Sequence, residues 1–434
     1  MKRDSLLIFP ERDFSVLDIL WLRKTHLPNL TVFCHADDHE KVLSLGGTVV
    51  HYKGGHLAPC RDDLADLTRQ LPSFAETDVS LYCPANDIPH PFALSTLRLL
   101  GIREAHSLTK DGKHSLRLRP VPDQNAINTL LLKACGGIGN LVLTTSLLSA
   151  SLSQGWKTYF SPTSDLDATS LAELFDGNLP KGLRLIRPNE LKSIEPDVIL
   201  NIEDHASLEE DDFFHAPYRI GTTGHEPGFA AQFFKNITGV TVDISRTFVG
   251  GTPDRINQDL KNRIVVCPGS KNGWDSKRWP HMDALLRRLD NPIVLCRKAD
   301  LDAYETLDFL TPITAPNAEY LTNSSLQEAA SILASASIVI ANDCGPAHIA
   351  AATGTPTLFL FGPSSQEKNR HPRPNVINLS LNLDCQPCQG RTDGPGRLAP
   401  HDYNCETNFQ CLAGLSEDMV LDAVHRHMRH MESK

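Results

Sequence analysis

Short apolar runs alternate with amphipathic stretches along most of the chain. In the first 120 residues this pattern predicts four strands, at Leu6–Phe9, Leu30–Cys34, Thr48–Tyr52 and Val79–Cys83. It also predicts helices between them, at Val16–Lys24, Asp38–Leu45, Asp62–Leu71 and Ala93–Leu100. Strands that alternate with helices favour a parallel sheet covered by helices. The polar stretch 107–127, which contains two prolines, is predicted to be a linker.

Two further α/β regions follow this linker. The predicted strands are Asn128–Lys133, Thr158–Phe160, Leu183–Ile186, Val198–Ile202, Arg263–Cys267, Ile293–Cys296, Ile338–Ala341 and Thr357–Phe361. The predicted helices are Leu141–Leu152, Met282–Leu289, Ser325–Ala334, Ala347–Ala352 and Glu417–Met431. A stretch rich in proline and glycine, Gly224–Pro253, separates the two regions. The organisation predicted is an additional α/β domain at 1–120, one lobe at 126–255 and a second lobe at 262–434.

Composition excludes several classes of protein. Hydrophobic residues are 41% and charged residues 22% of the 434 residues, as in ordinary globular proteins. The net charge of −10 argues against non-specific binding of nucleic acid, which needs a basic surface. The sequence contains no run of 18 apolar residues, so no membrane span is predicted. The apolar run Leu6–Phe9 is too short for a signal peptide. We therefore expect a cytoplasmic protein with at most peripheral contact with the membrane.

A glycine-rich segment, Cys135–Thr145, lies between a predicted strand and a predicted helix. Glycines let the backbone approach a bound group, and the helix presents its positive end. Such turns also occur for packing alone. The segment is not a P-loop, since no Gly-Lys-Ser/Thr follows, and the spacing of Gly136, Gly137 and Gly139 does not fit a dinucleotide-binding fingerprint.

A basic loop, Pro268–Pro280, follows the first strand of the second lobe. It contains three cations together with hydroxyl and amide donors, which are the groups that phosphate oxygens prefer. Its two tryptophans, Trp274 and Trp279, either stack on a flat ring or plug the loop onto the core.

A third segment, Ala341–His348, ends a strand and begins a helix. Asp343 is placed either to bind sugar hydroxyls or to cap the helix. The amide of Gly345 and the end of the helix suit a pyrophosphate. Two phosphate-type sites in one lobe indicate a diphosphate ligand such as a nucleotide-sugar.

These three segments together resemble glycosyltransferase family 9, which contains the ADP-heptose heptosyltransferases of lipopolysaccharide. The resemblance covers about residues 126–430 and rests on Cys135–Leu148, on Ser276–Pro280 and on Asn342–Pro356 followed by Phe361–Ser364. It implies a GT-B fold, with two Rossmann-like lobes that carry parallel sheets. It also implies direct displacement with inversion at the anomeric carbon and no catalytic metal.

The resemblance also assigns roles to particular residues. Lys277 would be the cation on the donor phosphates and a catalytic residue. The donor-binding residues implied are Gly139, Ser270, Lys277, Arg278, Asp343, Cys344, Gly345, Pro346 and His348. The chain departs from the family at Asn140, where the relatives have the aspartate that acts as general base. A carboxamide cannot accept that proton but can orient the acceptor hydroxyl. Another carboxylate or a histidine then takes over, or deprotonation is late, or the lobe is not catalytic.

Four cysteines near the C-terminus form the last pattern. Cys385 and Cys388 are a Cys-x2-Cys pair, and Cys405 and Cys411 follow within the same segment, 385–411. Four thiolates can bind one tetrahedral metal, and both zinc and iron suit sulfur ligands. We predict a structural zinc or iron site at this cysteine knuckle. Buried or surface thiols are the alternative.

The leading hypothesis is an inverting glycosyltransferase. It would move a heptose or related sugar from a nucleotide-diphosphate donor, such as ADP-heptose, to a bacterial surface glycan, a glycolipid or a protein. The alternatives are a nucleotide-sugar epimerase of the same fold and a non-catalytic sugar-binding or partner-binding protein. The oligomeric state is left open by the sequence, and an oligomer is compatible with it.

Overall fold

The structure is a computed structural model. It describes residues 4–9, 16–25, 27–52, 77–82, 97, 102, 104–109, 112–117, 123–134, 137–162, 165–175, 179–203, 214–217, 226–250, 260, 263–271, 274–302, 310–388 and 405–432. The predicted helix Asp62–Leu71 and all of Ala93–Leu100 except Leu97 lie outside the described residues.

The N-terminal region contains a six-stranded sheet in the order β3-β2-β1-β4-β5-β6. Its strands are β1 Ser5–Ile8, β2 Leu30–His35, β3 Thr48–Tyr52, β4 Asp78–Tyr82, β5 Glu104–Thr109 and β6 Gly112–Arg117. Neighbouring strands of this sheet are parallel except β5 and β6, which are antiparallel. The linker predicted over 107–127 is therefore wrong where it overlaps these two strands. An edge hairpin needs only one buried face, so its sequence is too polar to read as a strand.

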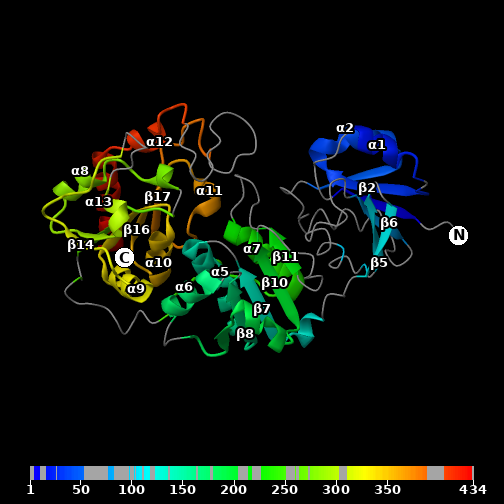
Figure 1. The fold of residues 1–434 in the computed structure, drawn as a ribbon, viewed down its shortest axis with the longest axis horizontal. Helices are drawn as coiled ribbons and strands as arrows, with labels where there is room; N and C mark the ends of the chain where they lie inside the picture. Colours follow the sequence, from blue (N-terminus) through cyan, green and yellow to red (C-terminus); the bar gives the residue numbers. More distant parts are fainter. Residues whose placement is uncertain are drawn as a thin grey trace. The chain divides into compact units, whose positions relative to one another are not determined.

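The helical segments that the structure describes in this region are short. They are α1 Val16–Leu22, α2 His39–Val42 and the 3₁₀ turns η1 Ala36–Asp38 and η2 Leu43–Leu45. Ile19 and Leu22 of α1 and Val42 of α2 bury their side chains against Leu7 and Val32 of the sheet. Both helices lie on the same side of β2 (Figure 1). The four strands predicted here are confirmed to within one or two residues.

The middle region contains a five-stranded sheet in the order β11-β10-β7-β8-β9. Its strands are β7 Thr129–Ala134, β8 Lys157–Pro162, β9 Leu183–Leu185, β10 Val198–Glu203 and β11 Phe214–Pro217. Its helices are α5 Ile138–Ser153, α6 Asp165–Phe175 and α7 Glu226–Thr238, with the 3₁₀ turns η4 Gln124–Ala126 and η5 Pro188–Ser193. Helix α7 lies within the stretch Gly224–Pro253, which is rich in proline and glycine. A helix can form there because its proline lies in the first turn, where proline is tolerated.

The C-terminal region contains a parallel six-stranded sheet in the order β14-β13-β12-β15-β16-β17. Its strands are β12 Ile264–Cys267, β13 Ile293–Leu295, β14 Glu319–Leu321, β15 Ile338–Asn342, β16 Thr357–Leu360 and β17 Val376–Leu379. Its helices are α8 Met282–Arg288, α9 Leu326–Ser335, α10 Gly345–Thr353, α11 Gln366–Asn369, α12 Gln410–Ala413 and α13 Glu417–Glu432, with the 3₁₀ turns η9 Asp275–Lys277 and η10 Lys298–Leu301. The two edge strands, β14 and β17, escaped prediction because they are short and only partly buried.

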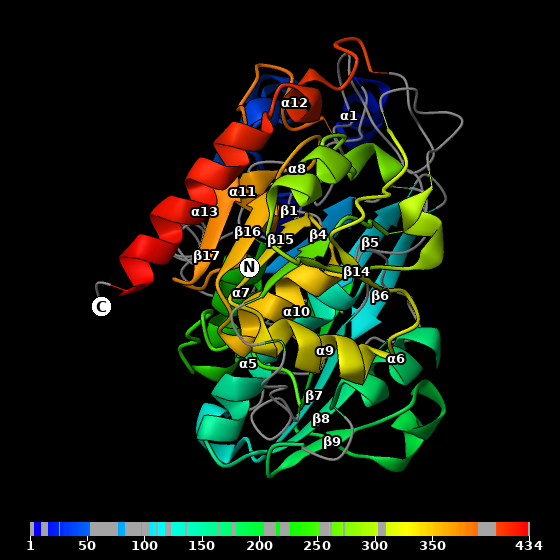
Figure 2. The same cartoon turned by 90° about the vertical axis from the view of Figure 1, so that its left-hand side faces the viewer.

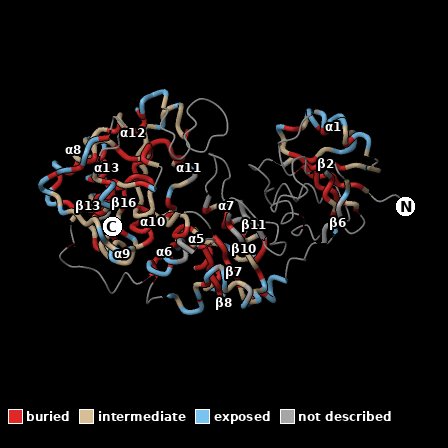
Figure 3. Tube along the Cα trace, viewed as in Figure 1, coloured by how far each residue is buried: buried red, intermediate tan, exposed pale blue. Residues whose placement is uncertain are grey.

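Helices cover both faces of this C-terminal sheet. Leu358 and Leu360 pack in one core with side chains of α8 and α13, such as Leu285 and Val424. Phe359, between them on β16, points to the other face and packs on a histidine of α10. Figure 2 shows α13 running alongside β17, and Figure 3 shows buried positions through β16 and α10. Successive side chains of a central strand are thus buried on opposite faces of the sheet, which explains why these strands are continuous apolar runs in the sequence.

By contacts the chain divides into two compact units. One comprises Met1–Lys133, Glu195–Ile220 and Gln232–Thr241, and the other comprises Ala134–Ile194, Gly221–Ala231 and Val242–Lys434. The division into three regions, 1–120, 126–255 and 262–434, stays a prediction. Among the described residues, no helix is long and apolar enough to cross a membrane.

Candidate functional site

Two neighbouring strands of the C-terminal sheet, β12 and β15, end side by side. Cys267 pairs in register with Ala341, so the loops that follow both strands leave the same edge of the sheet. After β12 the chain continues to β13 on one side, and after β15 it continues to β16 on the other side. The strand order therefore reverses between β12 and β15. Ligands of open α/β sheets bind at such a point. Both predicted phosphate segments therefore lie at the same place.

Asn342, the last residue of β15, fixes the basic loop at this edge. Its buried side chain accepts a hydrogen bond from the amide of Trp279 (3.1 Å) and donates one to the carbonyl of Pro268 (2.7 Å). One carboxamide thus connects the two ends of the loop. The sequence reading did not single out this residue. The available signal was a polar residue that ends an otherwise apolar strand.

Two residues of the basic loop face inward. Trp279 is buried and donates its indole N–H to the carbonyl of Leu415 (3.0 Å), so it plugs the loop onto the core. Arg278 is also buried, and it donates to the carbonyls of Asp300 (2.6 Å) and Asp302 (3.3 Å). Its guanidinium braces the loop from inside, and the expectation that it binds a phosphate stays a prediction.

Lys277 and Asp343 form a buried ion pair. The Nζ–Oδ2 distance is 2.9 Å, and the side chains are 12% and 6% exposed. The same Oδ2 accepts a hydrogen bond from Asn369 (3.0 Å), and His348 Nε2 lies 3.8 Å from Oδ1. Burial raises the pKa of Asp343, but Lys277 and His348 outweigh it and hold that pKa far below its usual range. The carboxylate is therefore ionised at neutral pH.

Asp343 does not cap helix α10, so that alternative is wrong. The N-cap of α10 is Cys344, whose side chain makes no capping hydrogen bond. Burial raises the pKa of the Cys344 thiol to about 12, and the thiol stays protonated. Gly345 and Pro346 open the helix, which presents its positive end beside the carboxylate.

The beginning of α5 packs against α10. A Cβ added to Gly139 would lie 2.6 Å from Cδ2 of His348, and one added to Gly345 would lie 3.3 Å from Cβ of Ile138. The first contact leaves no room for a Cβ unless His348 moves, and the second is tighter than most Cβ contacts. The two glycine-bearing turns that the sequence marked as separate candidates therefore meet in the structure.

Asn140 lies in the first turn of α5, next to Gly139. Its amide donates to the carbonyl of Gly137 (2.9 Å), and its own carbonyl accepts from Thr144 (2.9 Å). No hydrogen bond joins its side chain to another described residue, so the carboxamide is available to a ligand. Ser270 is buried in the loop after β12, where its carbonyl accepts from Arg297 (3.0 Å). Cys135 and Gly136 lie outside the described residues.

The four cysteines of the predicted knuckle come near one another. Burial, followed by the proximity of Cys388, Cys405 and Cys385, raises the pKa of Cys411 to about 12. Cys388 and Cys405 share a small apolar cluster with Phe409. Among the described residues, however, no group of three or more His, Cys, Asp or Glu side chains is arranged to bind a metal. The thiol donors suit zinc or iron, and the metal site stays a prediction.

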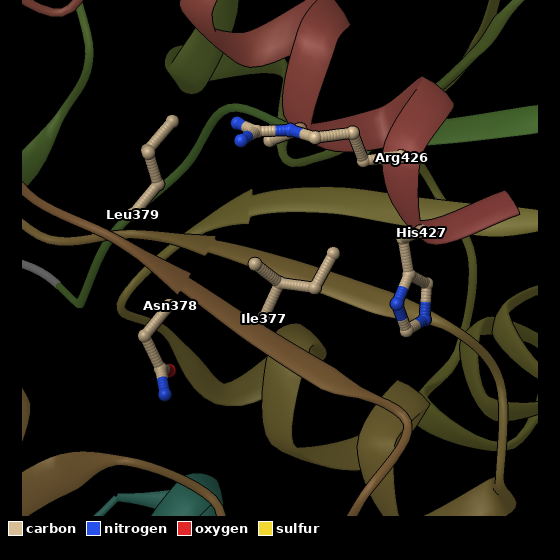
Figure 4. Close-up of a pocket in the computed structure, with 6 residues that line it drawn as sticks. Ile377, Asn378, Leu379, Arg426 and His427 are labelled. Carbon is tan, nitrogen blue, oxygen red and sulfur yellow. The ribbon is translucent and has the colours of Figure 1, made fainter. Parts of the chain in front are cut away.

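A hollow of about 390 Å³ lies elsewhere, between the edge strand β17 and helix α13. Figure 4 shows Ile377 and Asn378 pointing to opposite faces of the strand, with Arg426 and His427 coming from α13. Arg426 donates to the carbonyl of Asp422 on its own helix (3.2 Å). None of the predicted site residues lines this hollow, so it plays no part in the candidate site.

A family model identifies the region that carries this site. Glycosyltransferase family 9 (heptosyltransferase) matches residues 245–398. This part of the chain belongs to glycosyltransferase family 9. The family 9 region contains Ser270, Lys277, Asp343, Asn369 and two of the four cysteines, whereas Gly139, Asn140, Cys405 and Cys411 lie outside the matched range.

Curated relatives agree with this assignment. Lipopolysaccharide heptosyltransferase 2 of Salmonella typhimurium is 31% identical over 113 residues, which are 24% of this chain and 32% of the relative. Lipopolysaccharide heptosyltransferase 1 of Pseudomonas aeruginosa is 37% identical over 76 residues, which are 18% of this chain and 21% of the relative. The matches span no more than about a third of either relative.

Solved structures share the fold. The iron-containing dodecameric heptosyltransferase TibC of enterotoxigenic E. coli, in complex with ADP-D-beta-D-heptose, has a TM-score of 0.51 at 16% identity and covers 73% of this chain and 79% of its own. A family 9 glycosyltransferase of Veillonella parvula has a TM-score of 0.51 at 16% identity, with coverage of 70% and 98%. These likenesses confirm the predicted α/β fold with parallel sheets, like that of the heptosyltransferases. The additional N-terminal domain and the cysteine knuckle stay predictions.

Proposed function

We propose that this chain is an inverting glycosyltransferase that uses a nucleotide-diphosphate sugar, with ADP-heptose as the leading donor. The acceptor would be a bacterial surface glycan, a glycolipid or a protein, and the reaction would take place in the cytoplasm or at the inner face of the membrane. The observation that carries the proposal is the buried Lys277–Asp343 pair beside the first turn of α10, at the edge where β12 and β15 end.

The donor diphosphate would lie against this pair. Asp343 holds the ammonium of Lys277 in place, and an ammonium has three N–H donors, of which the aspartate takes one. The remaining donors and the first amides of α10 can bind phosphate oxygens. Charge that develops on the departing nucleoside diphosphate would be stabilised by the same groups, which favours direct displacement.

Asn140 would orient the acceptor hydroxyl across from the donor. Its carboxamide can accept a hydrogen bond from the hydroxyl but cannot take the proton. This residue is also the observation that favours the alternative, a sugar-binding protein without catalysis. Hydrolysis of the donor separates the two functions, because an enzyme should slowly release nucleoside diphosphate without acceptor and a binding protein should not.

The test of the proposal is a thermal-shift screen of nucleotide-sugars followed by a hydrolysis assay with the best ligand. Stabilisation by one nucleotide-sugar, with release of the nucleoside diphosphate, is the expected result. No stabilisation by any nucleotide-sugar would contradict the proposal. Stabilisation without hydrolysis or transfer would favour the binding protein.

We also propose one structural metal ion at Cys385, Cys388, Cys405 and Cys411. If all four thiolates bind it, no coordination position is left for chemistry, so it supplies stability only. The backbone amide of Cys388 donates to the carbonyl of Pro363 (3.1 Å), which ties the cysteine segment to the loop after β16. Chelation or Cys388→Ser should lower the melting temperature by several degrees. Elemental analysis with neither zinc nor iron, and four titratable thiols in the native protein, would contradict the metal.

A further inference from the structure

Asn369 touches the proposed donor site from a segment that the sequence reading did not mark. It is the last residue of α11, and its Nδ2 donates to Oδ2 of Asp343 (3.0 Å). The same oxygen accepts from Nζ of Lys277 (2.9 Å). One carboxylate oxygen is thus held by two donors, of which one is charged and the other is neutral.

The two donors differ in what a diphosphate would do to them. An anion beside the pair draws the ammonium of Lys277 toward itself and weakens its one hydrogen bond to the carboxylate. The amide of Asn369 carries no net charge, so it stays on Asp343 when the ammonium turns. Asp343 is ionised, and an ionised carboxylate that lost its second donor would follow the ammonium or repel the incoming phosphate.

The chain around Asn369 is itself fixed. The amide of Asn369 donates to the carbonyl of Ser365 (3.0 Å), and prolines at 372 and 374 prevent the helix from continuing. Arg373 donates through Nε to Oγ1 of Thr247 (3.2 Å) and through Nη2 to the carbonyl of the same residue. A side chain carried by such a segment can define the position of its partner.

We propose that Asn369 is a positioning residue of the donor site: it holds Asp343 in place while Lys277 turns to the donor diphosphate. The proposal rests on the proposed function, because it requires that a nucleoside diphosphate binds beside this pair. Asn369 acts through Asp343.

The chain offers a matched control in Asn375, which follows in the same segment. It is a buried asparagine whose Nδ2 donates to the carbonyls of Thr355 (2.6 Å) and Ala351 (3.4 Å), at the far end of α10. Asn375→Ala should lower stability without changing affinity for a diphosphate. Asn369→Ala should do the reverse, with a small effect on stability and a loss of about tenfold in affinity.

The experiment is calorimetric titration of the full chain with ADP, with GDP, UDP and CDP in parallel. Wild type, Asn369→Ala, Asn369→Ser and Asn375→Ala are compared at a temperature where all four are folded. Asn369→Ser keeps a donor and should recover part of the loss. Equal affinity of wild type and Asn369→Ala would overturn the inference and leave the proposed function standing. No binding of any of the four diphosphates to wild type would overturn both.

Asn369→Asp provides a readout that a purely structural role would not give. It would add a carboxylate beside Asp343, which Lys277 and His348 also contact. Affinity for the diphosphate should then fall more than in Asn369→Ala near pH 8. It should recover as the pH falls toward 5, because the added carboxyl takes up a proton and donates again. A loss that does not change with pH, or a loss as large in Asn375→Ala, would overturn the inference.

Discussion

Two lysine–aspartate pairs with the same Nζ–Oδ2 distance belong to two regions whose sheets have the same strand order. In the N-terminal sheet Lys113 and Asp78 have an Nζ–Oδ2 distance of 2.9 Å, and in the C-terminal sheet Lys277 and Asp343 have the same distance. Numbered along the chain, both sheets have the order 3-2-1-4-5-6. The pairs differ in burial, because the first has side chains 41% and 35% exposed and the second 12% and 6%.

The difference shows that neither strand order nor a short ion-pair distance identifies a site. Water screens the exposed pair, which contributes little. The second pair is largely shielded from water, so each partner depends more on the other and on neighbouring dipoles. Lys277 and Asp343 follow the two strands where the order reverses, whereas Lys113 lies on an edge strand. The position on the fold and the exclusion of water together distinguish them.

The largest expected effect comes from removing each lysine in turn. Lys277→Ala should lower donor affinity and turnover by about 10- to 100-fold, since a charge-assisted phosphate contact contributes about 1.5–3 kcal/mol. It should also lower the free energy of unfolding by roughly 3 kcal/mol, because a buried carboxylate loses its counter-ion. Lys113→Ala should change stability by less than about 1 kcal/mol and leave activity intact. Donor titration and urea unfolding of both variants check this, and equal effects would remove the distinction between the pairs.

The next effect is a dependence on pH. The pKa of Asp343 is lowered in the folded protein relative to its ordinary value near 3.8. Its ionised form therefore contributes stability above that ordinary value, and the contribution is lost as the pH falls below it toward the folded pKa. The stability difference between wild type and Asp343→Asn should be constant from pH 7 to about pH 5 and shrink below about pH 4. Unfolding curves across this range check the sign, and a difference that grows on acidification would contradict the assignment.

A smaller effect is expected where α5 meets α10. Gly139→Ala would bring a methyl group to 2.6 Å from the buried His348 ring, and relief of that clash should cost about 1–3 kcal/mol. Gly137→Ala is the control, since its Cβ would meet only the Lys271 side chain, at 3.9 Å. Melting temperatures of the two variants check the contact. If Gly137→Ala is as destabilised as Gly139→Ala, the close approach does not hold in solution.

The smallest effect concerns Asn140. Asn140→Asp should fold as well as wild type, because a carboxylate in the first turn of a helix is favoured by a few tenths of a kcal/mol. Its turnover should equal or exceed that of wild type, since it restores the carboxylate that the resembling enzymes use. Asn140→Ala should lose turnover if the amide orients the acceptor. Transfer assays on both variants check this, and wild-type turnover in both would remove Asn140 from the site.

The sequence determined the α/β class and the central strands, and it marked the two loops that the structure brings to one edge of the C-terminal sheet. Central strands such as β12 and β15 are buried on both faces, so they read as uninterrupted apolar runs. The turn from β15 into α10 could be predicted because proline is favoured in the first turn of a helix. Edge elements were missed for the opposite reason. β14 and β17 are only partly buried, so their composition carries no strand signal.

Only the tertiary structure decided which of the predicted site residues face the core and which face the candidate site. Arg278 and Lys277 are adjacent and both basic. The guanidinium of Arg278 nevertheless donates inward to backbone carbonyls, whereas the ammonium of Lys277 faces Asp343. Trp279 fills the core, although a stacking role was equally compatible with its position in the sequence. Asn342 and Asn369 entered the site only through contacts across 63 and 26 residues. Local patterns record the periodicity of burial, whereas the partner of a polar side chain depends on which distant segment packs beside it.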